Sequence, residues 1–272
     1  MTNKQPRRIE TYRANRKYYH EAPRRPERTG HPVFLAAPLF GAAVIFLILF
    51  AWQWQGYRRS AQEYDTLREQ LSWVQATPES GMLSRLDFAA LQARNPDTSA
   101  WLEMPGLDLS LPVMQSEDST YYLRRNFDGE YSNSGSLIRP SWDEGSWADG
   151  LCHVIHGHNI HDGSMFGSLD RYRDADFCAQ NPTFTLYTPD GDFLCTVFSA
   201  HEALATDDCY RLDFQPGEDY QAFLEDLKNL SFYDTGTELQ PDSRVLTLST
   251  CRSSYASNNQ RFVVHAVMTP LP

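Results

Sequence analysis

A cysteine, an arginine and a histidine are the residues of this chain whose types and spacing suit covalent chemistry. Cys251 ends a β-rich run that begins at Arg244, and Arg261 begins the next β-rich run. Two antiparallel strands joined by the polar segment between them would hold Cys251 and Arg261 side by side. A nearby positive charge favours the thiolate, which is the nucleophilic form of cysteine. Because His158 also follows a β-rich run, the three residues offer a nucleophile, an oxyanion stabiliser and a proton carrier for acyl transfer through a thioester.

The alternation of residues before the cysteine predicts the face on which its sulfur lies. Leu246 and Leu248 share one parity of the expected strand. Thr247, Ser249 and Cys251 share the other. Since successive side chains of a strand point to opposite faces, the sulfur is predicted on the more polar face, away from the leucines. A buried structural cysteine at a strand end is the alternative interpretation of Cys251 taken by itself, and the histidine motif favours the nucleophile.

These motifs resemble the signature of the sortases, the cysteine transpeptidases of Gram-positive cell surfaces. The run 247–251, with Arg261 ten residues on and Gly157-His158-Asn159 upstream, carries the resemblance. Further motifs resemble class B sortases in the same order, from about residue 86 to the C-terminus. They are Asn95-Pro96-Asp97-Thr98 with Trp101 and Pro105-Gly106, Pro112-Val113, Tyr121-Tyr122-Leu123 with Asn126-Phe127, Asp162-Gly163-Ser164-Met165-Phe166, Leu186-Tyr187-Thr188-Pro189-Asp190-Gly191 and Tyr233-Asp234-Thr235-Gly236.

The resemblance implies a fold and a set of site residues. The fold is mainly β with accessory helices: a closed antiparallel sortase-type β-barrel, with N-terminal helices and a helical insertion before the cysteine strand. The implied catalytic residues are His158, Cys251 and Arg261. The implied substrate-binding residues are Asn126, His156, Ser249, Thr250 and Arg252. Family members commonly carry an aromatic residue at the position of His156, and the position of Arg252 is variable, so both bear on substrate preference.

The resemblance also implies a reaction and its partners. The enzyme would cleave a C-terminal sorting signal of a secreted protein after Thr, form a thioester, and transfer the acyl group to an amine of a peptidoglycan precursor or a pilin lysine. No cofactor is implied. The sequence leaves open whether the signal is of the Asn-Pro or the Leu-Pro type. A plain cysteine endopeptidase and a non-enzymatic extracellular β-barrel adhesion or interaction module are the alternatives.

Two other cysteine peptidase classes fit the sequence less well. In papain-like enzymes the cysteine precedes the histidine, whereas Cys251 follows His158 here. The caspase order agrees, but the Gln-Ala-Cys motif is missing. A zinc site is a further alternative for His153, His156, His158 and His161, but their spacing suits neither two ligands on one helix face nor a closed finger, so no metal is expected.

Charge is distributed unevenly along the chain. The formal net charge is −11 over 272 residues. Residues 1–30 hold nine Lys or Arg and three Glu, a balance of +6, which leaves −17 on residues 31–272. An acidic body of this kind argues against nucleic acid as a partner. The odd cysteine count of five would allow two disulfides and a free Cys251, with Cys152 and Cys195 as one such pair, and the sequence does not decide whether any disulfide forms.

An apolar segment near the N-terminus predicts a membrane anchor. Residues 33–52 are almost wholly apolar and uncharged, which is the length that a helix needs to cross a bilayer, and aromatic residues follow. The basic residues precede this segment, so we expect residues 1–32 to be a disordered cytoplasmic tail, 33–54 a retained transmembrane helix in contact with lipid, and the rest extracellular. Residues 55–82 would form a membrane-proximal helix, over 60–76, and a linker.

Residues 83–272 are expected to form the catalytic domain. A helix is predicted from Ser84 to about Ala93, since Ser84 and Asp87 suit a helix start, and another over Pro216–Leu230, where apolar residues recur at helical spacing. Thr188-Pro189-Asp190-Gly191 predicts a hairpin turn. Short β-rich runs bounded by turn residues favour an antiparallel barrel over βαβ units. The expected strands are Trp101–Met104, Leu109–Gln115, Gly135–Arg139, Cys152–Ile155, Thr183–Thr188, Phe193–Ala203, Arg244–Thr250 and Phe262–Met268.

Overall fold

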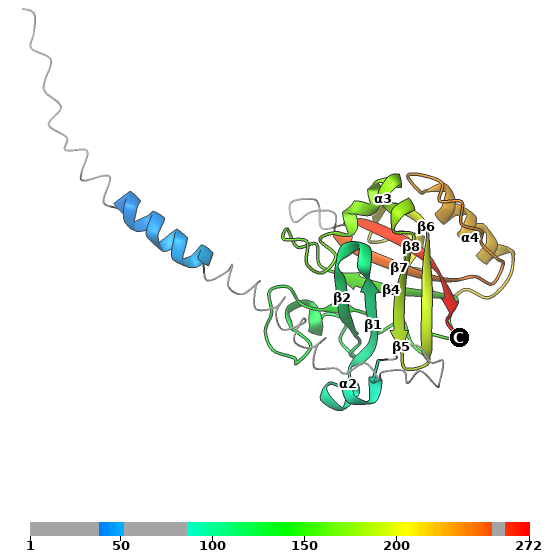
Figure 1. Cartoon of the computed structure of the whole chain (residues 1–272), viewed down its shortest axis with the longest axis horizontal. Coiled ribbons are helices and arrows are strands. Elements are labelled where there is room, and N and C mark those ends of the chain that lie inside the picture. The colour runs from blue at the N-terminus through cyan, green and yellow to red at the C-terminus, as the bar shows by residue number, and fades with distance from the viewer. Residues whose placement is uncertain (1–37, 52–85, 252–258) are drawn as a thin grey trace, which may run out of the picture. The chain divides into compact units, whose positions relative to one another are not determined.

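The computed structural model describes residues 38–51, 86–251 and 259–272, with only the backbone of Cys251 (Figure 1). Three expectations lie outside these residues: the basic tail over 1–32, the helix and linker over 55–82, and the role of Arg252. The folded body begins at Leu86 and continues to the C-terminus, apart from residues 252–258.

The described part of the expected membrane anchor is a helix over residues 38–51. Among the described ranges, no helix combines the length and the apolar character that crossing a membrane requires. This finding contradicts the expectation of a single-pass protein anchored over 33–54, with its N-terminus in the cytoplasm and its catalytic domain outside. Residues 33–37 and 52–54 of that segment are not among those described.

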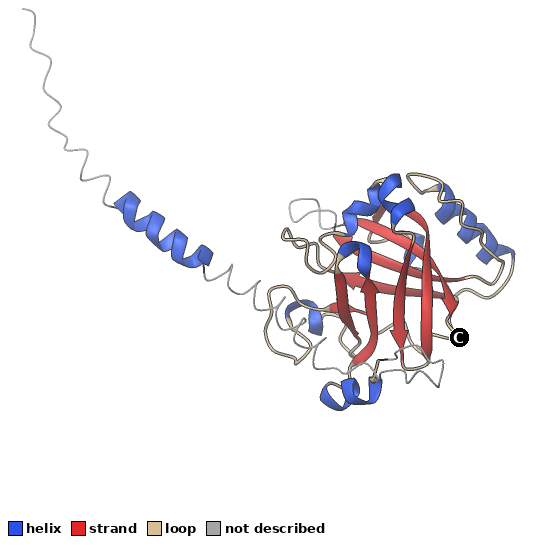
Figure 2. Ribbon diagram, viewed as in Figure 1, coloured by secondary structure: helices blue, strands red, loops and turns tan. Residues whose placement is uncertain are grey.

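Eight strands close into one barrel in the order β1-β2-β3-β4-β7-β8-β6-β5 (Figures 1 and 2). The mainly β fold class with accessory helices is therefore confirmed, and all eight expected strands form. Their bounds are β1 (Thr98–Met104), β2 (Leu109–Met114), β3 (Leu137–Ile138), β4 (Cys152–Gly157), β5 (Thr183–Thr188), β6 (Gly191–Leu204), β7 (Arg244–Cys251) and β8 (Gln260–Pro270).

Two strand pairs of the barrel are parallel, whereas the sequence predicted an antiparallel barrel. β2 pairs with β3 in parallel, and β4 pairs with β7 in parallel. A parallel pair needs a long connection, and the chain between β4 and β7 supplies one that contains β5, β6, two α-helices and two 3-10 helices. The expected hairpin turn is present, since Thr188 pairs with Gly191 between β5 and β6 and Gly191 has a φ of 143°.

The helices of the folded body lie outside the barrel (Figure 2). The first helix of the body, α2 (Phe88–Arg94), begins at Asp87, whose carboxylate accepts a hydrogen bond from the Ala90 N–H at 3.0 Å. The helical insertion expected before the cysteine strand is confirmed as α4 (Glu218–Asn229). The remaining helical segments are short: α3 (Ala175–Gln180) and the 3-10 helices Pro105–Leu107, Tyr121–Arg124, Leu169–Arg173 and Asp208–Tyr210.

Alternation along β7 sorts its side chains between two apolar clusters. Leu246 and Leu248 are fully buried in the main cluster, which fills the barrel. Val245 belongs to a second cluster on the other face, together with Val263 of β8 and the buried side of α4. Both faces of β7 are buried near its start, which explains why successive residues there are apolar whichever face they point to. The predicted separation of the leucines from the polar parity is confirmed for the side chains that the structure describes.

Candidate active site

Strand pairing brings three distant segments of the chain to one edge of the barrel. In the parallel pair β4–β7, His156 lies opposite Ser249. In the antiparallel pair β7–β8, Cys251 lies opposite Arg261. Because β4 and β7 run in the same direction, their carboxyl ends meet at the same edge, and His158 follows there directly after β4. The predicted side-by-side placement of Cys251 and Arg261 is therefore present in the backbone register.

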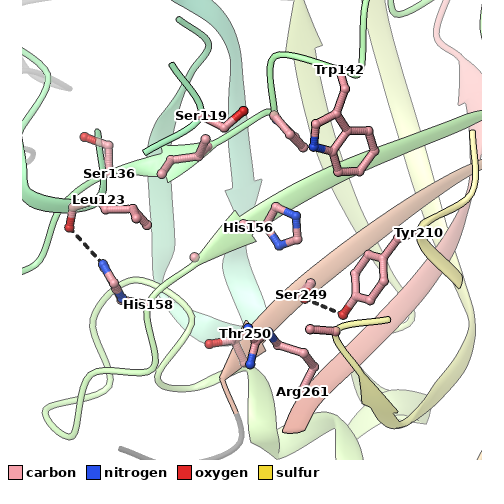
Figure 3. A pocket seen from close by; sticks show the side chains of 14 residues that line it. Ser119, Leu123, Ser136, Trp142, His156, His158, Tyr210, Ser249, Thr250 and Arg261 are labelled. Carbon is pink, nitrogen blue, oxygen red and sulfur yellow. Dashed lines mark hydrogen bonds between the residues drawn. The ribbon is translucent and has the colours of Figure 1, made fainter. Parts of the chain in front are cut away.

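A pocket of about 260 Å³ opens at this edge (Figure 3). Four of the sequence-predicted residues lie in its wall beside Arg261: His156, His158, Ser249 and Thr250. Its full lining is Ser119, Leu123, Ser136, Ile138, Pro140, Trp142, His156, Gly157, His158, Ala205, Tyr210, Ser249, Thr250 and Arg261. Strands β4, β7 and β8 and the segments on either side of β3 thus contribute to one site.

The imidazole of His158 is held by a backbone carbonyl. Its Nε2 lies 2.8 Å from the carbonyl oxygen of Leu123 (Figure 3). Since a carbonyl oxygen can only accept, Nε2 must carry a hydrogen, and in the neutral ring Nδ1 is then the basic nitrogen. Gly157, directly before it, has no space for a side chain, because a Cβ there would lie 2.6 Å from the ring of Phe166. The close packing of this glycine positions the backbone from which His158 projects.

The second imidazole of the pocket, His156, is electrostatically different. Burial and the positive charge of Arg261 lower the pKa of His156 to about 4, so the ring is neutral at pH 7. Its ring centroid lies 5.8 Å from that of Tyr210, with the planes tilted by 32°. A neutral ring packed beside an aromatic one gives this part of the pocket an apolar surface with hydrogen-bonding nitrogen atoms.

Tyr210 is a lining residue that sequence reasoning missed. It lies in the 3-10 helix Asp208–Tyr210 between β6 and α4, and its hydroxyl is 2.9 Å from the Ser249 hydroxyl. Burial raises the pKa of Tyr210, so the hydroxyl stays protonated. Ser119, Leu123, Ser136 and Trp142 were missed in the same way. Ser119 and Trp142 lie in irregular segments and Leu123 lies in the 3-10 helix Tyr121–Arg124, where no periodic pattern marks a residue as part of a site, while Ser136 directly precedes β3.

Two polar side chains on the cysteine side complete the pocket. The guanidinium of Arg261 donates to the carbonyl oxygen of Gln260 at 3.1 Å. Thr250 is 2% exposed, and its hydroxyl has no hydrogen-bond partner among the described residues. Buried hydroxyls usually have a partner, so this unpaired one lowers stability. A guanidinium and an imidazole in one pocket can stabilise an oxyanion and move a proton.

The structure gives Asn126 another position. It does not belong to the pocket lining, and it is 5% exposed. Its side-chain oxygen accepts the backbone N–H groups of Asp128 and Glu130, at 3.1 and 2.9 Å. This amide therefore stabilises the turn after Tyr121–Arg124, and the structure does not bring it together with the other predicted site residues.

The other histidines and cysteines of the body have separate surroundings. The ring of His153 is buried and bonds Asp143 at 3.0 Å, away from the pocket lining. Within the described ranges, no group of three His, Cys, Asp or Glu side chains is arranged to hold a metal ion. Four buried cysteines are free thiols: Cys152, Cys178, Cys195 and Cys209. Burial raises the pKa of Cys152 and Cys209 to about 12, which makes both thiols unreactive.

Known proteins are similar to this chain in sequence and in fold. A family model described as the sortase domain matches residues 102–269. Sortase B of Staphylococcus aureus is 28% identical over 229 residues, which cover 82% of this chain and 92% of that protein. Sortase B of Listeria monocytogenes is 31% identical over 182 residues, which cover 66% of this chain and 73% of that protein. A solved structure of a Staphylococcus aureus sortase B–substrate complex matches with a TM-score of 0.72 and 25% identity, covering 80% of this chain and all of that one.

Proposed function

Because this chain belongs to the sortase family and is a cysteine transpeptidase, we propose that Cys251 is its nucleophile, Arg261 its oxyanion stabiliser and His158 its proton carrier. The strongest support for this assignment is that the three residues come together at one site. His158 and Arg261 line the same pocket, and the backbone of Cys251 lies opposite Arg261 in the β7–β8 register. The catalytic unit is then residues 83–272, a proposal that the extent of the family match supports.

Acylation begins with attack of the Cys251 thiolate on the carbonyl carbon of Thr in a sorting signal. The carbonyl oxygen gains negative charge, which the guanidinium of Arg261 stabilises by charge-assisted hydrogen bonds worth about 3 kcal/mol. The C–N bond then breaks. The departing amine takes a proton from the His158 imidazolium, and the acyl group stays on sulfur as a thioester.

Deacylation reverses these roles. Neutral His158 accepts a proton from the incoming amine, whose nitrogen attacks the thioester carbon, and the thiolate leaves. The hydrogen bond from His158 to the Leu123 carbonyl supports this assignment, because it leaves Nδ1 as the basic nitrogen. Water competes with the amine, so slow hydrolysis is expected when no amine is present.

The donor and acceptor are proposed by chemical class. The donor is the C-terminal sorting signal of a secreted protein, of the Asn-Pro or the Leu-Pro type, and the acceptor is an amine of a peptidoglycan precursor or a pilin lysine. A sortase B–substrate complex and a sortase B complexed with triglycine are among the structures with this fold, which supports an acyl donor and an amine as the two ligands. Transfer to an added amine separates this reaction from plain endopeptidase activity.

Two substitutions test the assignment on the full chain. Cys251→Ala should abolish cleavage of fluorogenic sorting peptides and leave the thermal midpoint of unfolding unchanged. Arg261→Lys should lower kcat/KM at least about 100-fold, because a point charge cannot reproduce the planar guanidinium. Cleavage by the Cys251→Ala enzyme, or full activity of the lysine enzyme, would contradict the assigned roles.

Thiol alkylation provides a matched comparison within one molecule. Cys251 should react fast with iodoacetamide, while the four buried thiols should react slowly, since burial disfavours their thiolate forms. Mass spectrometry of the labelled peptides identifies the reactive site. Equal and slow labelling of all five cysteines would favour the non-enzymatic interaction module.

A further inference from the structure

Trp142 is a half-exposed tryptophan in the wall of the catalytic pocket. It follows β3 in the turn 140–143, and 50% of its surface is accessible. The other large aromatic side chain of this wall, Tyr210, has its hydroxyl bonded to Ser249. Among the described residues, the indole of Trp142 makes no hydrogen bond, ring contact or cation–π contact. An exposed tryptophan in a pocket wall is a surface that a ligand can cover.

The backbone that carries Trp142 is held from one side by a pair of serines. The Ser141 N–H donates to the Ser119 hydroxyl at 2.8 Å, and the two hydroxyls are 2.9 Å apart. The turn itself closes with a bond from the Asp143 N–H to the Pro140 carbonyl at 3.0 Å. Ser119 and Pro140 also line the pocket, so this anchoring is part of the pocket wall.

Asp143 holds the turn from the other side. Its buried carboxylate accepts bonds from Arg139 at 2.8 Å, from the Val154 N–H at 3.0 Å and from His153 at 3.0 Å. Although burial raises the pKa of Asp143, the bonds from His153 and Arg139 outweigh it and hold that pKa below its ordinary value. The carboxylate is therefore ionised and fixed to β4. Trp142 projects from a rigid backbone, so covering it costs little conformational entropy.

The chemistry of the neighbouring pocket wall selects the kind of ligand group. In the view of Figure 3, Trp142, His156 and Tyr210 lie on one side of the pocket, and Leu123 and Ser136 lie on the other. Burial keeps His156 and Tyr210 uncharged near neutral pH.

The charged groups of the lining point to the same kind of ligand. The described lining contains no carboxylate. Since His156 is neutral, His158 and Arg261 are the lining residues that can carry a positive charge. Such a wall favours an apolar side chain and disfavours an ammonium or guanidinium.

We propose that Trp142 is a specificity-determining residue, whose indole packs against an apolar side chain of the acyl donor upstream of the scissile Thr, with His156 and Tyr210 forming the rest of this subsite. The inference rests on the proposed transfer reaction and adds a subsite to it. The proline that both candidate signal types contain is an apolar residue in the right part of the donor. The amine acceptor does not use this subsite.

The experiment compares Trp142→Ala, Trp142→Phe and Tyr131→Ala in the full chain. Tyr131 is a matched aromatic control, because it is 74% exposed and does not line the pocket. Donor probes are fluorogenic Asn-Pro and Leu-Pro peptides, each with versions in which Ala or Lys replaces the proline. Trp142→Ala should raise the KM for the proline peptides about tenfold and change kcat less than about twofold, because stacking and apolar contact are lost. Trp142→Phe should restore most of the affinity.

Selectivity provides the second readout. The unsubstituted enzyme should prefer proline over alanine and alanine over lysine, and Trp142→Ala should flatten this order without changing the KM for the amine. Unchanged donor KM in Trp142→Ala, an equal loss in Tyr131→Ala, or an equal loss for all peptides would overturn the subsite while the transfer reaction stands. If the unsubstituted enzyme cleaves no peptide, the proposed function fails, and the subsite with it.

Discussion

The outer face of strands β4, β7 and β8 is covered along one half and open along the other. On the covered half, Val245 of β7 and its β8 partner Val267 belong to one apolar cluster with Phe223 and Leu224 of α4. On the open half, the same face of β7 reaches Ser249, which lines the pocket. The strands are continuous between the halves. The same secondary structure thus supports a packed core at one end and a binding site at the other.

The two halves differ in the interactions that their side chains make. Under α4, apolar side chains are removed from water, and each buried leucine or phenylalanine contributes about 2 kcal/mol to stability. In the pocket, Ser249 is paired with Tyr210, while the Thr250 hydroxyl has no partner among the described residues. The pocket half therefore contributes less apolar burial to stability and presents polar side chains such as Ser249 to a bound substrate.

Buried polar residues mark the boundary between the two halves. The ring of His265 stacks on that of His201 with centroids 5.0 Å apart, and it bonds the Thr247 hydroxyl at 3.0 Å. The Ser199 hydroxyl lies 3.4 Å from the His201 ring and donates to the Leu227 carbonyl at the end of α4. Both rings are almost wholly buried. This cluster links the helix to the strands by hydrogen bonds where the apolar packing ends.

The largest expected difference between the halves is in stability. Leu224→Ala should lower the free energy of unfolding by about 3 kcal/mol, because it leaves a cavity under α4, and should leave the KM for a donor peptide unchanged. Urea unfolding and steady-state kinetics on the same sample measure both. Glu225→Ala, an exposed neighbour on the same helix, is the control and should change neither. A KM that rises with Leu224→Ala would mean that the two halves are coupled.

Acidification should weaken the boundary cluster. Burial lowers the pKa of His201 to about 4, against an opposing effect of Asp207, and burial with the neighbouring His201 lowers the pKa of His265 well below its ordinary value. Histidines of the unfolded chain protonate near pH 6.5, so below that pH the unfolded state binds protons that the folded state does not. Stability is therefore complete above about pH 6.5 and falls towards pH 4, by up to about 1.4 kcal/mol per pH unit for each histidine.

Unfolding in urea at pH 7, 6 and 5 measures this loss. His201→Gln removes one of the two titrating rings, so between pH 7 and pH 5 it should lose about 2 kcal/mol less than the unsubstituted chain does. His161→Gln is the control, because that ring is exposed. Parallel pH profiles for all three chains would show that His201 is not held neutral by the fold.

The smallest expected effect distinguishes two tyrosines. Tyr220 donates to the carbonyl oxygens of Leu151 and Ser243 on the covered half, whereas Tyr210 pairs with Ser249 on the open half. Each Tyr→Phe change should cost about 1 kcal/mol of stability through the lost hydrogen bond. Only Tyr210→Phe should also alter the KM for the donor, by about threefold or more. Identical kinetics for the two variants would indicate that the Tyr210 hydroxyl serves the fold alone.

Much of the site could be predicted from short patterns. The alternation in 244–251 predicts which residues enter the barrel, and Leu246 and Leu248 do so. The helical spacing in 216–230 predicts α4, whose buried residues recur at that spacing. His158 and Arg261 follow from their places beside β-rich runs, and both line the pocket. These predictions succeed because alternation and helical period act over a few residues, within a single element.

Other parts could not be predicted in this way. Asn126 matches a family motif, yet its amide oxygen is used by its own turn. Trp142 lies in a turn and Tyr210 in a short 3-10 helix, neither of which has a period that marks a site, and hydrogen bonds of Asp143 and Ser249 hold their surroundings. The apolar segment over 33–52 suggested a membrane span, but no helix among the described residues is long and apolar enough to be one.

The sequence by itself determined the eight strands, the helix before the cysteine strand, the polar parity of that strand and the residues that we propose carry out acyl transfer. Only the tertiary structure decided that β4 lies beside β7 in parallel, so that residues about ninety positions apart share one pocket edge. The physical reason is that local patterns specify how a segment buries its own side chains, whereas strand partners are chosen when the whole barrel closes and every edge finds a neighbour.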